Sequence, residues 1–112
     1  MDDIASESST NEEKIYRSIF DNMLEVLYRA DHEERITLVS PSALKMFGYD
    51  SLEDLIGKKI RETFYQNPSD RNALLKKLAE QGKVVNYPLV LKRKDGTILH
   101  AKTTSYFIFC HF

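Results

Sequence analysis

The segment Ile36–Gly57 constrains the fold of this chain most, because its strand formers, caps and glycines set the order of three elements. The β-formers Ile36–Val39 predict a strand. Ser40-Pro41 supplies an N-cap and a residue whose fixed φ suits the first helical position, and Gly48 is placed to end that helix. In Ser51–Asp54 a hydroxyl and a carboxylate three residues apart predict another helix start. A strand therefore leads directly into two short helices.

The N-terminal residues divide into a polar stretch and an amphipathic helix. Residues 1–9 are small, polar and acidic, which predicts a disordered N-terminus because they bury too little apolar surface to offset the cost of ordering. Thr10 with Glu13 makes a capping box, which predicts a helix over residues 10–23. Its apolar stripe consists of Ile15, Tyr16, Ile19, Phe20 and Met23. Because this helix precedes the first strand, the stripe packs either against the outer face of the sheet or against another chain.

Two β-hairpins are predicted, one before and one after the helical segments in the sequence. Leu24–Ala30 and Arg35–Val39 make the first hairpin, and Val84–Lys92 and Ile98–Phe109 make the second, which turns at an Asp-Gly pair. Pro88 donates no backbone hydrogen bond, which predicts that its strand lies at a sheet edge. Alternation places Val26, Tyr28 and Ala30 on one face of the first strand, and Val85, Tyr87, Leu89 and Leu91 on one side of the third. In the last strand, the side predicted to be buried consists of Leu99, Ala101, Thr103, Ser105, Phe107 and Phe109.

A longer helix is predicted between the two hairpins. Asn67 is placed to cap it, Pro68 suits its first position, and Gly82 is placed to end it. Its buried face consists of Leu74, Leu75 and Leu78. The preceding segment Lys58–Tyr65 is less periodic and is predicted to be irregular or a single helical turn. Helices that are separate from antiparallel strands are typical of the α+β class.

Composition and charge restrict the class of function. The 112 residues suit one domain. The 16 basic and 17 acidic residues leave a formal net charge of −1, so the overall charge does not attract the chain to nucleic acid or to an anionic membrane. No apolar run approaches the roughly 20 residues that cross a bilayer, and the first residues lack a secretory signal. We therefore expect a cytoplasmic protein without membrane insertion or a nucleic acid partner. The glycines are isolated and no nucleophile set is suitably spaced, so we expect no enzymatic activity.

The segment from Ile36 to Lys58 resembles the PAS sensory domain, whose members commonly read I-x-x-V-N/S-P-A, then F/L-G-Y, and then E-E/D-L-I-G-K. Three later segments, Asp70–Leu75, Gly82–Val84 and Lys92–Thr97, also resemble the helix, exit glycine and hairpin of that family. The resemblance covers Tyr16–Phe109. It implies a PAS-like antiparallel sheet with short helices on one face and a flanking N-terminal helix, and it assigns residues 24–112 to the domain itself.

The resemblance also implies a function. Such a module changes the packing of its sheet and helices when a ligand or partner binds, and a flanking helix relays the change. The chain is therefore predicted to be a signal-sensing module of a signal-transduction protein, of the sensor histidine kinase type found in two-component systems. The alternatives are a ligand-free scaffold for protein interaction or dimerisation, and a haem or flavin sensor.

The chain departs from the family pattern after the second hairpin. A PAS domain continues with a fifth, central strand between those that match Leu24–Ala30 and Ile98–Phe109, and this chain stops instead. The two hairpins are then expected to make a half-open sheet with unpaired edges, which invite another chain. A truncated domain, a chain that has been cut short, or a second protomer that fills the gap would each account for this. We expect a homo-oligomer, with Ile15, Tyr16, Ile19, Phe20, Met23, Tyr106 and Ile108 at its interface.

The residue types that bind cofactors in other PAS domains do not occur at the matching positions of this chain. Flavin photosensors of the family carry a cysteine early in the third helical segment, and haem sensors carry a histidine on the long helix, but this chain has neither. His32, His100 and His111 are predicted to lie at the surface, and Cys110 and His111 point to opposite faces of a strand. We therefore expect no cofactor and no metal site.

A pocket for a small molecule is possible between the sheet and the helices. Its predicted lining is Val26, Tyr28, Phe47, Leu55, Leu74, Leu78, Leu89 and Thr103. Because most of these side chains are apolar and bulky, a filled core is the favoured alternative. Lys45 and Arg71 are interpreted as solvated helix charges, so an anionic ligand has no evident inward charge to bind it.

Overall fold

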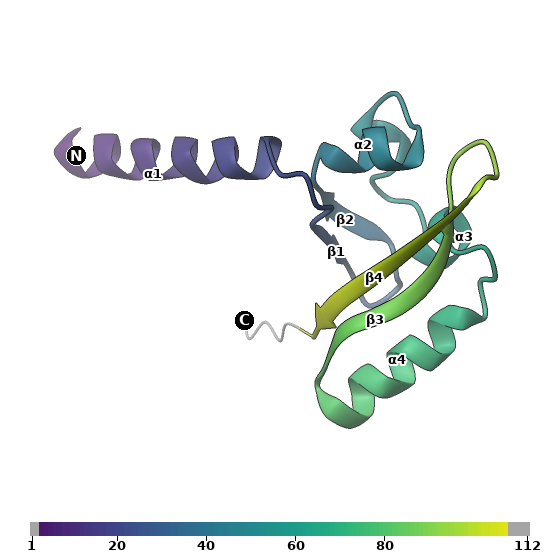
Figure 1. The fold of residues 1–112 in the computed structure, drawn as a ribbon. Coiled ribbons are helices and arrows are strands. Elements are labelled where there is room, and N and C mark those ends of the chain that lie inside the picture. Colours follow the sequence, from purple (N-terminus) through teal and green to yellow (C-terminus); the bar gives the residue numbers. More distant parts are fainter. Residues whose placement is uncertain (1–2, 108–112) are drawn as a thin grey trace.

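The chain folds as two antiparallel hairpins with short helices between them and a long helix that extends away from them (Figure 1). The computed structural model describes the backbone of residues 3–107 and the side chains of residues 11–107. The elements in order are α1 (Asp3–Asp21), β1 (Tyr28–Ala30), β2 (Ile36–Val39), α2 (Ser42–Phe47), the 3₁₀ helix η1 (Leu52–Asp54), α3 (Ile60–Phe64), α4 (Asp70–Gln81), β3 (Lys83–Lys92) and β4 (Ile98–Tyr106). This order confirms the α+β class.

Helix α1 is longer toward its N-terminus than the capping signal predicted. It begins at Asp3 and ends at Asp21, so Thr10 lies inside the helix and is not its N-cap. Since no proline or glycine occurs between these ends, each further helical residue adds a hydrogen bond at low cost once the helix has started. The disorder expected over residues 1–9 stays a prediction. Figure 1 shows α1 leading away from the hairpins.

The first hairpin is shorter than predicted, since its strands are limited to Tyr28–Ala30 and Ile36–Val39. Ser40 is fully buried, and its hydroxyl accepts a hydrogen bond from the Leu27 N–H at 2.9 Å. The Ser40 N–H donates to the Leu27 carbonyl at 2.8 Å. No side chain caps α2, so the prediction that Ser40 is an N-cap is wrong. The serine instead joins the end of β2 to the connection between α1 and β1.

The helices between the hairpins follow the sequence signals closely. Helix α2 ends at Gly48, and Ser51 caps the following helix, which is the 3₁₀ helix η1, by accepting a hydrogen bond from the Glu53 N–H at 3.2 Å. The segment 58–65 contains the single short helix α3. Helix α4 ends at Gly82, whose φ of 80° lies in the left-handed region and lets its N–H bond the Leu78 carbonyl. The signals at Gly48, Ser51 and Gly82 are therefore confirmed.

The predicted start of the long helix is wrong, because α4 begins at Asp70 without a side-chain cap. Asn67 instead accepts hydrogen bonds from the N–H and the hydroxyl of Ser69, at 3.2 and 2.8 Å, in the turn before the helix.

A bulge in β3 reverses part of the predicted facing. Val84 pairs with Ser105 but Tyr87 pairs with Thr103, so one extra residue is inserted between them. Asn86 has a φ of 52°, a left-handed conformation that asparagine tolerates well. Val84 is therefore buried and Val85 is 59% exposed, so the prediction that Val85 shares one side with Tyr87, Leu89 and Leu91 is wrong. Beyond the bulge, Tyr87, Leu89, Leu91, Leu99 and Ala101 contribute to the core as predicted.

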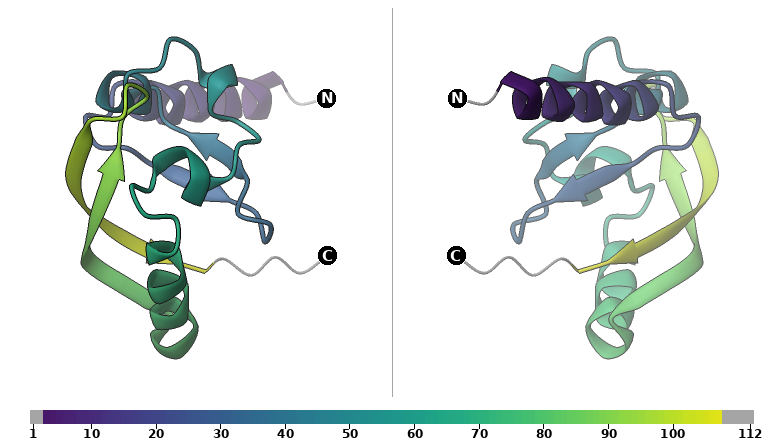
Figure 2. Two further views of the ribbon diagram at one scale, coloured as in Figure 1. Left: turned by 90° about the vertical axis from the view of Figure 1, so that its right-hand side faces the viewer. Right: turned by 90° about the vertical axis from the view of Figure 1, so that its left-hand side faces the viewer.

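The two hairpins make separate sheets rather than one half-open sheet. Within residues 3–107, β1 pairs with β2 and β3 pairs with β4, and no ladder joins β1 to β4. Figure 2 shows β1 with β2 and β3 with β4 as two separate strand pairs. The strand with Pro88 is thus an edge strand, as predicted, and only the isolated bridge between Tyr65 and Leu91 meets its other side in the described residues. Phe107 follows the end of β4 and is 45% exposed, so its predicted inward position is wrong, and Phe109 lies outside the described residues.

The core lies between the hairpins and the short helices. Val26, Tyr28 and Ala30 pack against it from the first hairpin, as predicted. The rings of Phe47 and Phe64 meet with their centroids 4.4 Å apart. The buried apolar side chains are Ile36, Val39, Ala43, Phe47, Leu55, Ile60, Phe64, Tyr65, Leu74, Leu78, Val84 and Leu91.

The bulge can be tested with adjacent, chemically identical residues. Val84→Ala removes buried methyl groups and should lower the free energy of unfolding by about 2 kcal/mol. Val85→Ala should change it by no more than about 0.5 kcal/mol, because that side chain is exposed. Urea unfolding of both variants measures the difference. A larger loss for Val85→Ala would mean that β3 follows regular alternation.

Candidate functional site

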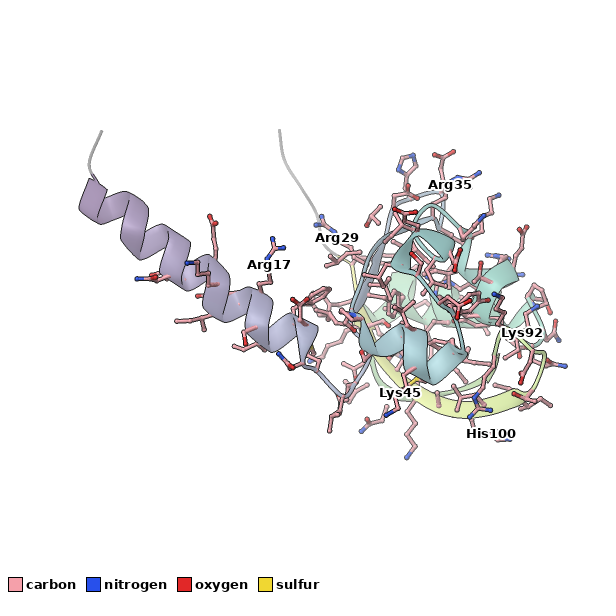
Figure 3. All side chains as sticks on the ribbon, turned by 90° about the horizontal axis from the view of Figure 1, so that it is seen from above. Arg17, Arg29, Arg35, Lys45, Lys92 and His100 are labelled. Carbon is pink, nitrogen blue, oxygen red and sulfur yellow. The ribbon has the colours of Figure 1, made fainter. Side chains whose placement is uncertain are left out.

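The side chain of Arg71 is buried in the domain, with 6% of its surface exposed. It lies on α4, where it precedes the buried residues Leu74 and Leu78 by three and seven positions. Because such positions share one face of a helix, Arg71 continues the buried face of α4. The interpretation of Arg71 as a solvated charge is therefore wrong. Lys45 is exposed as predicted, and Figure 3 shows it pointing away from the domain.

Glu34, in the turn between β1 and β2, provides the carboxylate beside Arg71. The φ of Glu34, 65°, is uncommon for a glutamate. Two hydrogen bonds of 2.9 Å fix this backbone: the Glu34 N–H donates to the Asp31 carbonyl, and the Glu34 carbonyl accepts from the Ile60 N–H. Arg71 Nε donates to Glu34 Oε1 at 3.2 Å. Arg61 on α3 binds the same carboxylate through Nη2 to Oε2 at 2.7 Å and Nε to Oε1 at 3.2 Å. One carboxylate thus serves two guanidinium groups.

A tyrosine hydroxyl contacts the buried guanidinium, and a row of hydroxyl groups lies between the hairpins. Arg71 Nη1 donates to the Tyr65 hydroxyl at 3.2 Å, and the guanidinium carbon lies 5.7 Å from the centroid of that ring. The hydroxyl of Tyr28 on β1 lies 3.0 Å from that of Ser105 on β4, which is 2.8 Å from the Thr103 hydroxyl. A side-chain hydrogen bond therefore connects the two hairpins. We call this group the Arg71 cluster: Tyr28, Glu34, Arg61, Tyr65, Arg71, Thr103 and Ser105.

The cluster shifts the pKa values of its two tyrosines in opposite directions. Burial by itself would raise the pKa of Tyr28, but the hydrogen bond with Ser105 and the charge of Arg71 more than offset it, so the pKa is lowered. The pKa of Tyr65 is raised, because its burial outweighs the contact with Arg71. The surroundings of the Tyr28 hydroxyl therefore favour negative charge.

The predicted pocket residues come together, but mainly as core. Phe47, Leu55, Leu74 and Leu78 are buried, and Val26, Tyr28 and Leu89 pack against them. Thr103 is partly buried, and its hydroxyl bonds Ser105 in the Arg71 cluster. The polar members Tyr28 and Thr103 thus lie where the core meets the Arg71 cluster.

A groove of about 370 Å³ lies elsewhere, beside the β3–β4 turn. It contains none of the predicted pocket residues. Tyr49 and Lys94 contact across it, with the ammonium 5.7 Å from the ring centroid. The lining residues are Tyr49, Asp54, Lys58, Glu62, Thr63, Lys92, Arg93, Lys94 and Gly96.

The candidate interface residues on α1 lie on an exposed surface. Ile15, Tyr16 and Ile19 are 58%, 67% and 59% exposed, and Phe20 and Met23 are partly exposed. On the outer face of β4, Tyr106 is 65% exposed. Ile108 lies outside the described residues. The stripe on α1 is therefore an apolar surface available for contact.

The described histidines lie at the surface. His32 and His100 are exposed, as predicted, and Figure 3 shows His100 on the outside of the domain. Cys110 and His111 lie outside the described residues. Within residues 11–107, no group of three or more His, Cys, Asp or Glu side chains is arranged to hold a metal ion.

Sequence reasoning missed Arg71 and Glu34, although a signal for one of them was present. Arg71 occupies a position of the helical stripe that also contains Leu74 and Leu78, and that spacing indicates a buried side chain. For Glu34 no local signal exists, because its role depends on Arg61 and Arg71, which are distant in sequence. Tyr28 and Thr103 were identified, but as pocket lining rather than as hydrogen-bonding groups.

Comparison with known proteins supports the resemblance seen in the sequence. A family model described as a PAS domain matches residues 9–111, which includes the hairpins and the whole Arg71 cluster. The search of curated proteins gave no match. In the part of the chain with a described backbone, no helix is both long and apolar enough to cross a membrane.

Replacing Glu34 tests the cluster and its pH dependence. Glu34→Gln should lower the free energy of unfolding by about 3 kcal/mol at neutral pH, because Arg71 loses its carboxylate. Burial would raise the pKa of Glu34, but Arg61 and Arg71 more than offset it and hold the pKa below its ordinary value of 4.5. The stabilisation is therefore complete above that value and is lost as pH falls through the lower pKa of the folded protein.

Urea unfolding at several pH values measures this difference, which should shrink in acid. Glu33→Gln, at the exposed neighbouring position, is the control and should change the stability little at any pH. A constant difference between wild type and Glu34→Gln across the acidic range would contradict the assigned role.

Proposed function

Because the chain belongs to the PAS domain family, we propose that it is the signal-sensing and dimerisation module of a signal-transduction protein of the sensor histidine kinase type. In this proposal the module binds a small molecule or a partner protein and relays packing changes through α1. It acts in the cytoplasm, catalyses no reaction and holds no cofactor. The observation that carries the proposal is the exposed apolar stripe on the helix that extends from the domain.

The stripe on α1 suits a second copy of the same helix. Ile15, Tyr16 and Ile19 are each more than half exposed, so pairing would remove a contiguous apolar surface from water. The charged side chains around the stripe have both signs, so two copies do not repel each other through a single sign of charge. These side chains are Glu12, Glu13, Lys14, Arg17 and Asp21.

A short hydrogen-bonded connection links α1 to the core. Ser42 donates to the Glu25 carbonyl at 2.7 Å, and Ser40 bonds both Ser42 and the Leu27 N–H. Leu27 directly precedes Tyr28, which bonds Ser105 on the other hairpin. A change at the Arg71 cluster would therefore reach the base of α1 through few contacts, which supports a relay role for this helix.

A second candidate function is a ligand-free interaction or dimerisation scaffold. The packed core favours it, because Phe47, Leu55, Leu74 and Leu78 fill the region where a ligand would bind. The two functions differ in a measurable way: a sensor is stabilised by its ligand in proportion to ligand concentration, and a scaffold is not.

Dimerisation through α1 can be tested by placing charge on the stripe. The variant with Ile15→Asp and Ile19→Asp should be monomeric where the wild type is dimeric, because two buried carboxylates would oppose pairing. Sedimentation equilibrium over a range of concentrations measures the association. The thermal unfolding of the domain should be unchanged, since both side chains are exposed on α1.

The double variant Asn11→Asp and Ser18→Asp is the matched control, because it adds the same two negative charges to the polar face of the same helix. It should leave the dimer intact. A wild type that remains monomeric at all concentrations, or a dimer unaffected by Ile15→Asp and Ile19→Asp together, would contradict pairing through α1.

A further inference from the structure

The charges in the Arg71 cluster do not balance. Arg61 takes both oxygens of Glu34, at 2.7 and 3.2 Å, and also bonds Asn72 at 2.8 Å. Arg71 shares only Oε1 of the same carboxylate, at 3.2 Å. Two guanidinium groups and one carboxylate leave one positive charge, and the less well paired guanidinium is the more buried one, with its side chain 7% exposed against 25% for Arg61.

The remaining neighbours of Arg71 are neutral phenols. Tyr65 accepts a hydrogen bond from it, and its charge acts on the Tyr28 hydroxyl. Burial by itself would lower the pKa of Arg71, but its interactions with Tyr65 and Tyr28 more than offset this and raise the pKa, so the guanidinium stays charged. An anion beside the cluster would complete the pairing.

Hydroxyl groups that could bind such an anion lie on one side of the cluster. Tyr28, Thr103 and Ser105 form a hydrogen-bonded row across the inner faces of β1 and β4. These side chains are only partly buried, and no ladder joins β1 to β4 within residues 3–107. Along β4 the same face continues with Ala101 and Leu99, which pack against the core. Polar donors therefore adjoin an apolar surface.

We propose that the Arg71 cluster binds the carboxylate of a small organic monoacid, whose apolar part lies along Ala101 and Leu99. The proposal rests on the sensing function above and names the class of its ligand. A carboxylate is favoured because its plane matches the donors of a guanidinium. A monoanion is favoured because the cluster has one excess positive charge, and the nearby Glu34 opposes a second negative charge.

Calorimetric titration of the whole chain with butyrate tests the proposal, at constant ionic strength. Butyrate should bind saturably, and butyramide, which has nearly the same shape but no charge, should bind at least about tenfold more weakly. Inorganic phosphate should also bind more weakly than butyrate. Absence of saturable butyrate binding, equal binding of butyramide, or equal binding of phosphate would each overturn the proposal.

Removing the hydroxyl row should weaken binding without unfolding the domain. The double variant Tyr28→Phe and Ser105→Ala keeps the contacts of Arg71 with Glu34 and Tyr65, and its affinity for butyrate should fall about tenfold or more. Tyr106→Phe removes a hydroxyl from the exposed outer face of the same strand and should leave the affinity unchanged. Equal affinity of the double variant and the wild type, with both folded, would overturn the proposal.

A spectroscopic measurement separates ligand contact from a structural effect. A carboxylate bound beside Tyr28 should raise the pKa of its hydroxyl, because a neighbouring negative charge disfavours the phenolate. Phenolate absorbance in the near ultraviolet is titrated against pH for the wild type and for Tyr28→Phe. The difference between the two curves reports the pKa of Tyr28, and it is measured with and without butyrate. An unchanged pKa at saturating butyrate would place the ligand elsewhere and overturn the proposal. A dimer that does not bind butyrate would contradict only this inference, whereas a monomer that binds it would contradict only pairing through α1.

Discussion

The burial of Arg71 is the constraint on which the arrangement of this domain depends. A guanidinium removed from water costs several kcal/mol unless hydrogen bonds and opposite charge compensate it. The compensation comes from the turn between β1 and β2, through Glu34, and from Tyr65 at the end of α3. Glu34 is held in an uncommon backbone conformation by bonds to Asp31 and Ile60. The polar cluster therefore sets how the first hairpin lies against α3 and α4.

The same cluster governs how the hairpins relate to each other. Because no ladder joins β1 to β4 within the described backbone, their relation depends on core packing and on the bond between Tyr28 and Ser105. Such a relation is easier to shift than a continuous sheet, which would have to break several backbone hydrogen bonds together. Tyr28 is adjacent to Leu27, which Ser40 ties to the start of α2. A movement at the cluster therefore has a direct route to the connection that leads into α1.

The parts of the fold that the sequence predicted are those decided by near neighbours. Gly48 and Gly82 end their helices, and Ser51 caps η1, because caps depend on a few residues of local backbone. The β3–β4 turn follows from its Asp-Gly pair in the same way. Most of the predicted pocket residues lie in or against the core, because period and apolar character together determine which face is buried.

The errors at Ser40 and Arg71 concern residues whose partners are distant in sequence. Serine is a common N-cap residue, but the Ser40 hydroxyl accepts a hydrogen bond from the Leu27 N–H instead. The bulge at Asn86 buries Val84 instead of Val85, although the alternation of residue types in the sequence does not show it. Arg71 is more instructive, because its spacing indicated burial and its charge led to the opposite interpretation. A charged residue within an apolar helical stripe is better treated as evidence for a buried partner than as a gap in the stripe. In this domain that partner is a carboxylate already shared with Arg61, and the charge that remains unbalanced gives the site its chemistry.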